Sequence, residues 1–290
     1  MDWFQLQYFK TVAEVENMTQ ASKLLHISQP SLSQTIKRLE TELGYPLFFR
    51  EGKKIRLNET GEILLHAVEQ MNQIMENSKL AMDEKNGKEV REVSLYIGCA
   101  SMLLASLLQH LKKCTPEIEY RINQWSGEVK NKEADFSIVS APVEDIQGNA
   151  RLLLRERILL ALPQNHPFVE KEKIYISDLK DEEFISLNEN WSLWETMRKA
   201  MESASFEPKI IMRVDNPSLM RELLSCQMGV AFVPEVTWHS FAGENIVMRL
   251  VEGCSMERNI WLKYKENRYL SHSMKACADG IEEFFGRLLY

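Results

Sequence analysis

The residues best suited to specific chemistry lie between positions 28 and 38, on the outer face of a short predicted helix. Ser28 is a natural N-cap, and Pro30 fits the first turn because its missing N–H would have no helical partner there. The outer face carries amides and hydroxyls followed by cations: Gln29, Ser31, Ser33, Gln34, Thr35, Lys37 and Arg38. Glutamine can pair with adenine, and cations neutralise phosphates. The face therefore suits nucleic acid, with an ordinary solvated helix face as the alternative.

Two further helices are predicted to hold this face in place. The apolar residues of the 28–43 helix recur at steps of four, three and four and share its opposite face; they are Leu32, Ile36, Leu39 and Leu43. Gly44 is expected to end the helix. A short helix over 19–25, beginning at the Thr19 hydroxyl, and an earlier helix over 2–15 are expected to pack beneath it. This pattern predicts a helix-turn-helix.

A basic turn follows. Residues 45–49 and 50–57 read as short extended segments around the tip Gly52-Lys53-Lys54, which predicts a β-hairpin. From such a hairpin, Arg50, Lys53 and Lys54 can reach phosphates or a neighbouring groove. A solvated turn is the alternative interpretation.

An uninterrupted helix is predicted from residue 58 to about residue 83, with Thr60 as its cap. Its seam positions alternate in steps of four and three, the period of a coiled coil: Leu64, Val68, Met71, Met75, Ser78 and Met82. So narrow a seam needs a second helix. The same helix of another copy would give a dimer that addresses two half-sites, and packing against its own domain is the alternative.

The net charge of −7 over 290 residues is unevenly distributed. Residues 1–60 hold eight Lys or Arg against seven acids, which leaves −8 for the rest of the chain. Six of the eight cations fall between Lys37 and Arg56. A local basic patch on an acidic chain indicates specific docking rather than general adhesion to nucleic acid.

Several other classes of protein lack support in the sequence. No apolar run approaches the roughly 20 residues that span a bilayer, and the first residues do not resemble a signal peptide, so a cytoplasmic location without membrane contact is expected. The five cysteines contain no Cys-x-x-Cys pair, and no cofactor, disulfide framework or metal site is predicted. No catalytic motif is present, and an enzyme is not expected.

Beyond a charged stretch at 83–92, strands and helices alternate, which predicts a parallel α/β sheet with ligands beyond the carboxyl ends of its strands. Strands are expected at 93–98, 118–122, 136–139, 158–162, 184–187, 210–214, 229–234 and 260–264. Helices are expected at 103–114, 192–204, 218–227 and 271–288. Ser192 and Glu195 have the spacing of a capping box.

The order of residues in 21–40, 43–50 and 57–61 resembles the N-terminal signature of the LysR-type transcriptional regulators. A thinner resemblance continues at 97–98, 133–138, 162–167 and 228–234. It implies an α/β protein with an N-terminal winged helix-turn-helix (1–60), a long linker and dimerisation helix (61–86) and a linker (87–92). A two-lobed α/β effector domain of the periplasmic-binding-protein type follows at 93–290. Lobe I would cover about 93–161 and 265–290, and lobe II about 162–264.

The resemblance implies a sequence-specific regulator whose recognition helix enters the major groove of double-stranded DNA. It implies a homodimer or homotetramer, and RNA polymerase is a candidate partner. The expected DNA-binding residues are Thr19, Gln29, Pro30, Ser31, Ser33, Gln34, Lys37, Arg38, Arg50, Lys53 and Lys54. The expected dimerisation residues are Leu64, Val68, Met71, Met75 and Met82. The alternative is a solute-binding or association module without regulatory DNA binding.

A small-molecule effector is expected in the cleft between the lobes. The expected lining is Ala100, Ser101, Met102, Gln124, Trp125, Ser126, Asn188, Trp191, Ser192, Asn216 and Phe232. Hydroxyls and free N–H groups at helix starts suit an anion, although the same residues are ordinary caps. The segment 125–133 is too short for the helix that the family usually has there, which predicts an altered or lost effector site.

Overall fold

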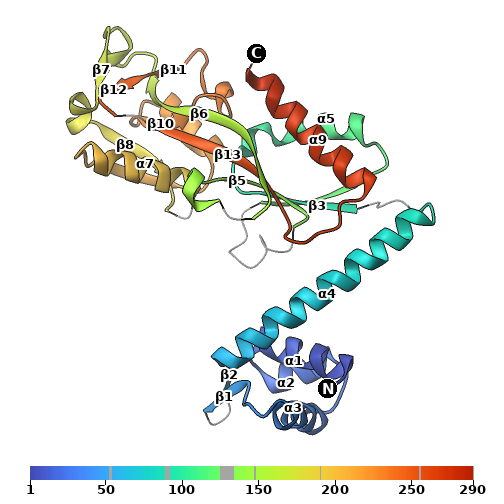
Figure 1. Cartoon of the computed structure of the whole chain (residues 1–290). Coiled ribbons are helices and arrows are strands. Elements are labelled where there is room, and N and C mark those ends of the chain that lie inside the picture. The colour runs from blue at the N-terminus through green and yellow to red at the C-terminus, as the bar shows by residue number, and fades with distance from the viewer. Residues whose placement is uncertain are drawn as a thin grey trace. The chain divides into compact units, whose positions relative to one another are not determined.

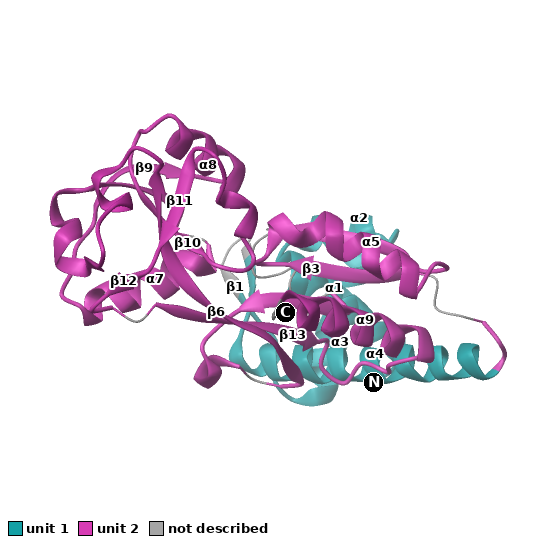
Figure 2. Cartoon of the chain, turned by 90° about the horizontal axis from the view of Figure 1, so that it is seen from above, with its two compact units in different colours: residues 1–85 teal, residues 86–290 magenta. Residues whose placement is uncertain are grey.

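The computed structural model describes residues 1–51, 54–88, 92–124, 134–146, 148–189, 191–254 and 256–289. The chain divides into two compact units, Met1–Lys85 and Asn86–Tyr290 (Figure 2). The predictions for Lys53, Trp125, Ser126 and the shortened segment 125–133 lie outside the described residues. No described helix is long and apolar enough to cross a membrane.

The first unit is a winged helix-turn-helix with a long helix after it. Its elements are α1 (Trp3–Val15), α2 (Met18–Leu24), α3 (Gln29–Leu43), β1 (Phe48–Glu51), β2 (Lys54–Leu57) and α4 (Glu59–Lys85). The two strands pair antiparallel as the predicted hairpin. Phe9, Leu32, Ile36 and Leu39 are fully buried in one core, so the apolar face predicted for 28–43 is confirmed.

The start and end of α3 follow the sequence prediction. Ser28 Oγ accepts a hydrogen bond from the N–H of Ser31 at 3.3 Å, and Pro30 occupies the first turn. Gly44 ends the helix with φ of +81°, a left-handed conformation that glycine adopts without strain. These local signals fix where the helix lies in the chain.

Two predicted caps are wrong. Asn17, rather than Thr19, caps α2 through its side-chain oxygen, which accepts from Gln20 N at 3.0 Å. Asn58, rather than Thr60, accepts from the third N–H beyond it at the start of α4, at 2.8 Å. In both cases an asparagine precedes the threonine and reaches the free N–H groups first.

The second unit is built on a mixed sheet. Its strands are β3 (Glu92–Ile97), β4 (Glu119–Gln124), β5 (Phe136–Ser140), β6 (Ala150–Pro163), β7 (Ile174–Tyr175), β8 (Glu183–Leu187), β9 (Lys209–Val214), β10 (Ala231–Pro234), β11 (Ile246–Arg249), β12 (Val251–Glu252) and β13 (Glu257–Tyr264). Its α-helices are α5 (Leu104–Cys114), α7 (Ser192–Ser203), α8 (Pro217–Ser225) and α9 (His272–Gly286). The 3-10 helices are η1 (Ser101–Leu103), η2 (Val143–Asp145), η3 (Pro167–Val169), η4 (Ile176–Asp181), η5 (His239–Phe241) and η6 (Arg287–Leu289).

The prediction of a parallel sheet is correct only for part of the unit. The main sheet has the order β10-β6-β13-β5-β3-β4, with β11 also paired to β6. β3 is parallel to β4 and β5, and β8 to β9, whereas β6 and β13 pair antiparallel with their neighbours. α5 connects β3 to β4 and α7 connects β8 to β9, but β13 enters the sheet from the other lobe and runs in the opposite direction.

Two hydrophobic cores define two lobes, and β6 and β13 extend from one to the other (Figure 1). Along β6, Leu154 belongs to the core of lobe I and Ile158 to the core of lobe II. Where the chain comes back toward lobe I, Met256, just before β13, belongs to the core of lobe II and Ile260 in β13 to the core of lobe I. The changes of lobe therefore lie a few residues before the expected limits at 161 and 265. The strand predicted over 158–162 covers only the second half of β6, and its first half was missed.

Candidate DNA-binding and effector-binding sites

The predicted DNA-reading face of α3 is open to solvent. Gln29, Pro30, Ser31, Gln34, Lys37 and Arg38 are exposed, as is Thr19 on α2, and Ser33 is half-buried. Pro30, Gln34 and Lys37 follow one another at steps of four and three, so their side chains form a single stripe along the helix. An amide and a cation on one ridge are suited to base edges and phosphate, respectively.

Burial on the opposite side of α3 fixes the direction of this stripe. Leu32, Ile36 and Leu39 each have 0% of their surface exposed. Rotation of the helix by one position would expose these side chains at about 1.5–3 kcal/mol each. The orientation of the polar face is therefore a consequence of the apolar pattern.

Two carboxylates fasten the hairpin to the helices. Glu40 on α3 accepts a hydrogen bond from Leu47 N at 2.9 Å, and Glu16, just after α1, accepts one from Leu57 N at 2.9 Å. Both acids lower the positive charge near the hairpin, and both carboxylates are engaged in hydrogen bonds at its base. Arg50 and Lys54 lie in β1 and β2, but their side chains are not described.

Gly61 in the first turn of α4 lies tightly against the same hairpin. A Cβ at this position would lie 2.6 Å from Leu57 Cδ1 and closer still to the carbonyl oxygen of Leu47. Asn58 reinforces the contact, because its Nδ2 donates to Pro46 O at 2.9 Å. The 57–61 motif is therefore a packing motif that positions the hairpin.

The predicted seam of α4 divides into two parts. Val68 is fully buried in the core of its own unit and Leu64 packs against that core, so the alternative of packing on its own domain holds for these two. Met71, Met75 and Met82 are exposed, together with Ile63 and Ile74, which the predicted seam does not include. The spacing of eleven residues between Ile63 and Ile74, which is three helical turns, is the sequence signal that could have placed these two residues on one exposed apolar face.

In the second unit, a cavity of about 360 Å³ lies where the lobes meet. It is bounded by the end of β5, by α7 and by the start of β13: Ser140, Ala141, Pro142, Val143, Glu144, Thr196, Lys199, Ala200, Glu257, Arg258 and Asn259. Its size suits a small metabolite. None of these residues was among the predicted effector residues.

Some predicted effector residues do lie near this junction. Ser101 and Met102 are half-buried in η1, where Met102 packs against the core of the second lobe, and Ala100 precedes them with φ of +57°. Trp191 and Ser192 begin α7, and Trp191 packs against the same core. These residues come from both lobes, as expected for a cleft between them.

Others have structural roles. Phe232 is 1% exposed and its ring stacks on Phe184 at 5.3 Å, so its side chain fills the core and the prediction that it lines a cleft is wrong. Asn216 caps α8 through Leu219 N at 2.9 Å. Asn188 donates to Asp215, and Gln124 is exposed at the end of β4.

Two hydroxyls at the junction lack a hydrogen-bond partner in the part of the chain that the structure describes. Ser140 Oγ and Ser192 Oγ are buried and unpaired among the described residues. The predicted capping box of Ser192 is wrong, because Trp191 is the cap residue and no described side chain caps α7. η1 also starts without one. Unpaired buried hydroxyls and uncapped N–H groups suit a polar ligand.

The cavity residues that the sequence analysis missed differ in how clearly the sequence indicates them. Ser140 stands at the carboxyl end of a correctly predicted strand, and Thr196 lies one helical turn after Ser192. Both could have been found by extending the rule that selected their neighbours. Arg258 gave no signal, because its place depends on a strand that returns from the other lobe.

Arg258 belongs to a buried network beside the cavity. Arg258 Nε donates to Glu156 Oε1 at 2.8 Å, and both side chains are almost fully buried. Glu156 also accepts hydrogen bonds from the N–H groups of Val236 and Thr237 at 2.9 and 2.8 Å. The Thr237 hydroxyl donates to Glu156 Oε1 and accepts from Arg258 Nη2. This network ties β6 to β13 where they pass between the lobes.

A winged helix-turn-helix joined to a two-lobed α/β unit with a cavity at the lobe junction is the architecture of a ligand-responsive DNA-binding protein. Residues 3–62 match the family described as "Bacterial regulatory helix-turn-helix protein, lysR family", and residues 92–286 match the "LysR substrate binding domain". The chain belongs to the LysR family and is a LysR-type DNA-binding transcriptional regulator with an effector-binding domain.

Known relatives agree with this assignment. The HTH-type transcriptional regulator AlsR of Bacillus subtilis (strain 168) is 30% identical over 243 residues, 81% of this chain and 80% of AlsR. The transcriptional dual regulator GltC of the same organism is 28% identical over 299 residues, 99% of each chain. Both relatives are named as transcriptional regulators.

Solved structures share the fold. A full-length variant of OxyR from Pseudomonas aeruginosa has a TM-score of 0.68 at 21% identity, covering 97% of this chain and 94% of that one. Full-length CbnR complexed with its target DNA has a TM-score of 0.59 at 19% identity, covering 98% and 99%.

Proposed function

We propose that α3 enters the major groove and that its exposed face divides the work of recognition. Gln29, Ser31, Ser33 and Gln34 read base edges, while Lys37 and Arg38, with Thr19 and the hairpin cations Arg50, Lys53 and Lys54, hold phosphates. The observation that carries this proposal is the full burial of one face of α3 opposite an exposed polar face. In this proposal the chain has no catalytic role, and it binds its operator in the cytoplasm.

Two copies of the chain bind two half-sites. The exposed apolar side chains of α4 from residue 71 onward support pairing with the same helix of a second copy, because an isolated apolar seam gains stability only when it is covered. Met71, Met75 and Met82 would lie in that interface, with Ile74 between them.

The effector is a small polar molecule, and an anion fits best. The unpaired Ser140 and Ser192 hydroxyls and the uncapped start of α7 support this proposal, since each offers a hydrogen bond to a negatively charged group. Binding between the lobes would change their relative angle and so the spacing of the DNA-binding units in a dimer.

Anisotropy binding to the DNA flanking the gene, against a scrambled duplex and across a salt series, tests the DNA assignment. Gln34→Ala should lower discrimination between the two duplexes by about 1–3 kcal/mol, and Lys37→Ala should weaken both equally and reduce the salt slope by about 1. Gln109→Ala, an exposed glutamine of α5, is the control. Identical behaviour of Gln34→Ala and Lys37→Ala would refute the division. Absence of binding at low salt would leave the two-lobed unit as the functional part.

Thermal-shift screening with small carboxylates and phosphates tests the effector site. A ligand should raise the melting temperature of the wild-type chain and lose most of this effect in Ser140→Ala and Ser192→Ala. Ser203→Ala, at the far end of α7, is the matched control. A ligand whose effect survives in both variants binds elsewhere.

A further inference from the structure

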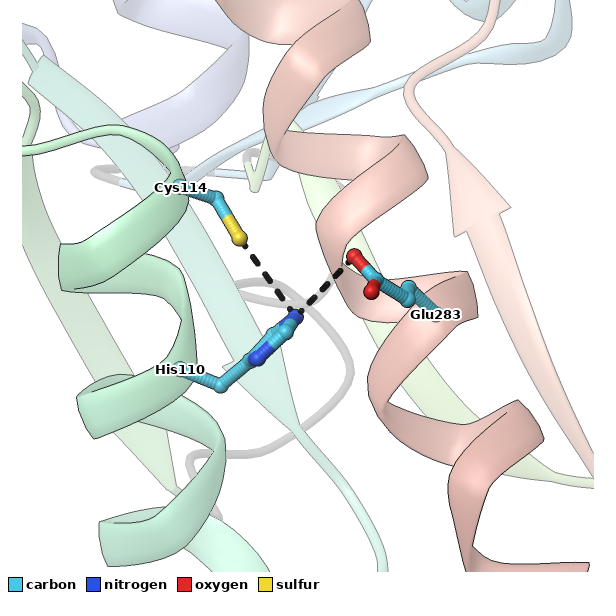
Figure 3. Close-up of side chains that lie close together, drawn as sticks. All are labelled: His110, Cys114 and Glu283. Atoms are coloured by element: carbon cyan, nitrogen blue, oxygen red, sulfur yellow. Dashed lines mark hydrogen bonds and ion pairs between the residues drawn. The ribbon is translucent and has the colours of Figure 1, made fainter.

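A histidine, a cysteine and a glutamate meet on the surface of the first lobe. His110 and Cys114 lie one turn apart in the last part of α5, and Glu283 projects toward them from α9 (Figure 3). The three residues come from helices that pack side by side, and none belongs to the DNA-binding or effector residues described above. Their meeting could not be predicted from the sequence, because Glu283 is distant from the other two in the chain.

The distances among the three side chains match those of metal ligands. His110 Nε2 lies 3.4 Å from Cys114 Sγ and 3.6 Å from Glu283 Oε2, and all three ligand atoms are within 4.8 Å of one another. A tetrahedral zinc ion with bonds of about 2.0–2.3 Å holds neighbouring ligand atoms roughly 3.3–3.6 Å apart. Two of the three separations already have this value, and the third, between the sulfur and the carboxylate, is no more than 4.8 Å.

The surrounding contacts explain why the three groups are so close. Gly280 lets the helices approach, because a Cβ there would lie 3.1 Å from Leu111 Cδ2 and 3.7 Å from Cys114 Sγ. The His110 ring packs against Phe284 at 6.0 Å between ring centres. Arg287 pairs with the other oxygen of Glu283 and so orients the carboxylate. The cluster is thus held by packing that does not depend on a metal.

We propose that His110, Cys114 and Glu283 bind one divalent cation of the zinc class, with water completing the coordination. A thiolate, an imidazole and a carboxylate favour Zn²⁺ or Co²⁺ over Mg²⁺ and Ca²⁺, which take oxygen ligands. As the sulfur–metal bond forms, the thiol proton passes to solvent. The bound cation cross-links the end of α5 to the C-terminal helix α9. A surface hydrogen-bond chain without metal affinity is the competing interpretation.

Cobalt titration of the reduced, chelator-treated full-length protein tests the site, because a cobalt–thiolate bond gives a charge-transfer band in the near ultraviolet. The wild-type chain should bind one Co²⁺ with this band, and Zn²⁺ should displace it. Cys114→Ser should abolish the band, and Glu283→Gln and His110→Gln should weaken binding about tenfold or more. Cys226→Ser, which removes an exposed cysteine of the other lobe, should change nothing.

Unfolding of a variant can be separated from loss of a ligand. Glu283 is half-exposed, so Glu283→Gln should keep the metal-free melting temperature of the wild type. Zn²⁺ should then raise the melting temperature of the wild type and of Cys226→Ser, raise that of Glu283→Gln by less, and leave that of Cys114→Ser unchanged. A band that survives Cys114→Ser, or a wild-type chain without any band at millimolar Co²⁺, would overturn the proposal.

Discussion

The two units of the chain differ in how they assemble their functional surfaces. In the first unit, the proposed DNA-reading residues lie within ten consecutive positions of one helix, and the apolar residues between them fix their direction. In the second unit, the cavity joins a strand end, a helix and the start of a returning strand. Its neighbouring ion pair joins residues 102 positions apart. One surface depends on local periodicity, and the other depends on topology.

This difference predicts which property a single substitution in each unit should change. Changes on the exposed face of α3 should alter DNA recognition with little effect on stability, because those side chains contact solvent. Changes in the buried Glu156–Arg258 network at the lobe junction should alter stability, because these groups bridge β6 and β13. Four substitutions or conditions test this contrast, in order of decreasing effect.

Glu156→Gln should have the largest effect. It leaves Arg258 buried with its charge no longer neutralised, which typically costs about 3–5 kcal/mol of unfolding free energy. Urea denaturation followed by tryptophan fluorescence measures this loss. Glu235→Gln breaks the exposed ion pair with Arg157 and should cost less than about 1 kcal/mol. Equal, small losses in both variants would show that the buried network does not hold the lobes.

Gly61→Ala should destabilise the first unit by about 1–3 kcal/mol through overpacking against the hairpin. DNA affinity should fall as the hairpin shifts, even though Gly61 carries no polar side chain. Calorimetry together with anisotropy measures both effects. Gly286→Ala, at a helical glycine where an added Cβ has no described atom within 4 Å, is the control and should be neutral or slightly stabilising. An unchanged melting profile for Gly61→Ala would contradict the packing argument.

Alkaline pH should destabilise the second unit through its buried thiols. Burial raises the pKa of Cys99 and of Cys277 to about 12 from an ordinary value near 9. As the pH rises, the thiols of the unfolded chain therefore lose their protons before those of the folded chain. The contribution of these thiols to the free energy of unfolding is fully present below pH 9 and declines as the pH rises toward 12. The loss should be roughly 1 kcal/mol for each thiol at pH 10.

The dependence of the urea midpoint on pH between 8 and 10.5 measures this effect. Cys99→Ala with Cys277→Ala should flatten the slope, whatever the change in absolute stability. Cys226→Ala, at an exposed cysteine, should leave the slope unchanged. A double variant with the wild-type slope would exclude these thiols as its cause.

Asn216→Ala should have the smallest clear effect, about 1 kcal/mol, because it removes the cap of α8. Ser192→Ala should leave stability nearly unchanged, because the Ser192 hydroxyl makes no cap bond among the described residues. Chemical denaturation of the two variants compares them directly. A larger loss for Ser192→Ala would restore the capping box that the sequence suggested.

The sequence by itself determined most of the first unit. Ser28, Pro30 and Gly44 placed α3, and the steps between Leu32, Ile36 and Leu39 decided which face is buried. These signals work because helix capping and amphipathic periodicity act over a few residues. The misplaced caps of α2 and α4 show the limit of that resolution, since two suitable residues stood within two positions of each other.

Only the tertiary structure decided the junction of the second unit and the distribution of the α4 seam. Val68 is covered by its own domain while Met75 is exposed, although both fit one heptad pattern. Phe232 fills a core, whereas Ser140, Thr196 and Arg258 meet at a cavity. Periodicity gives the face on which a side chain lies but not what covers that face. The covering element is set by strand order and chain reversal, which depend on contacts between residues far apart in the sequence.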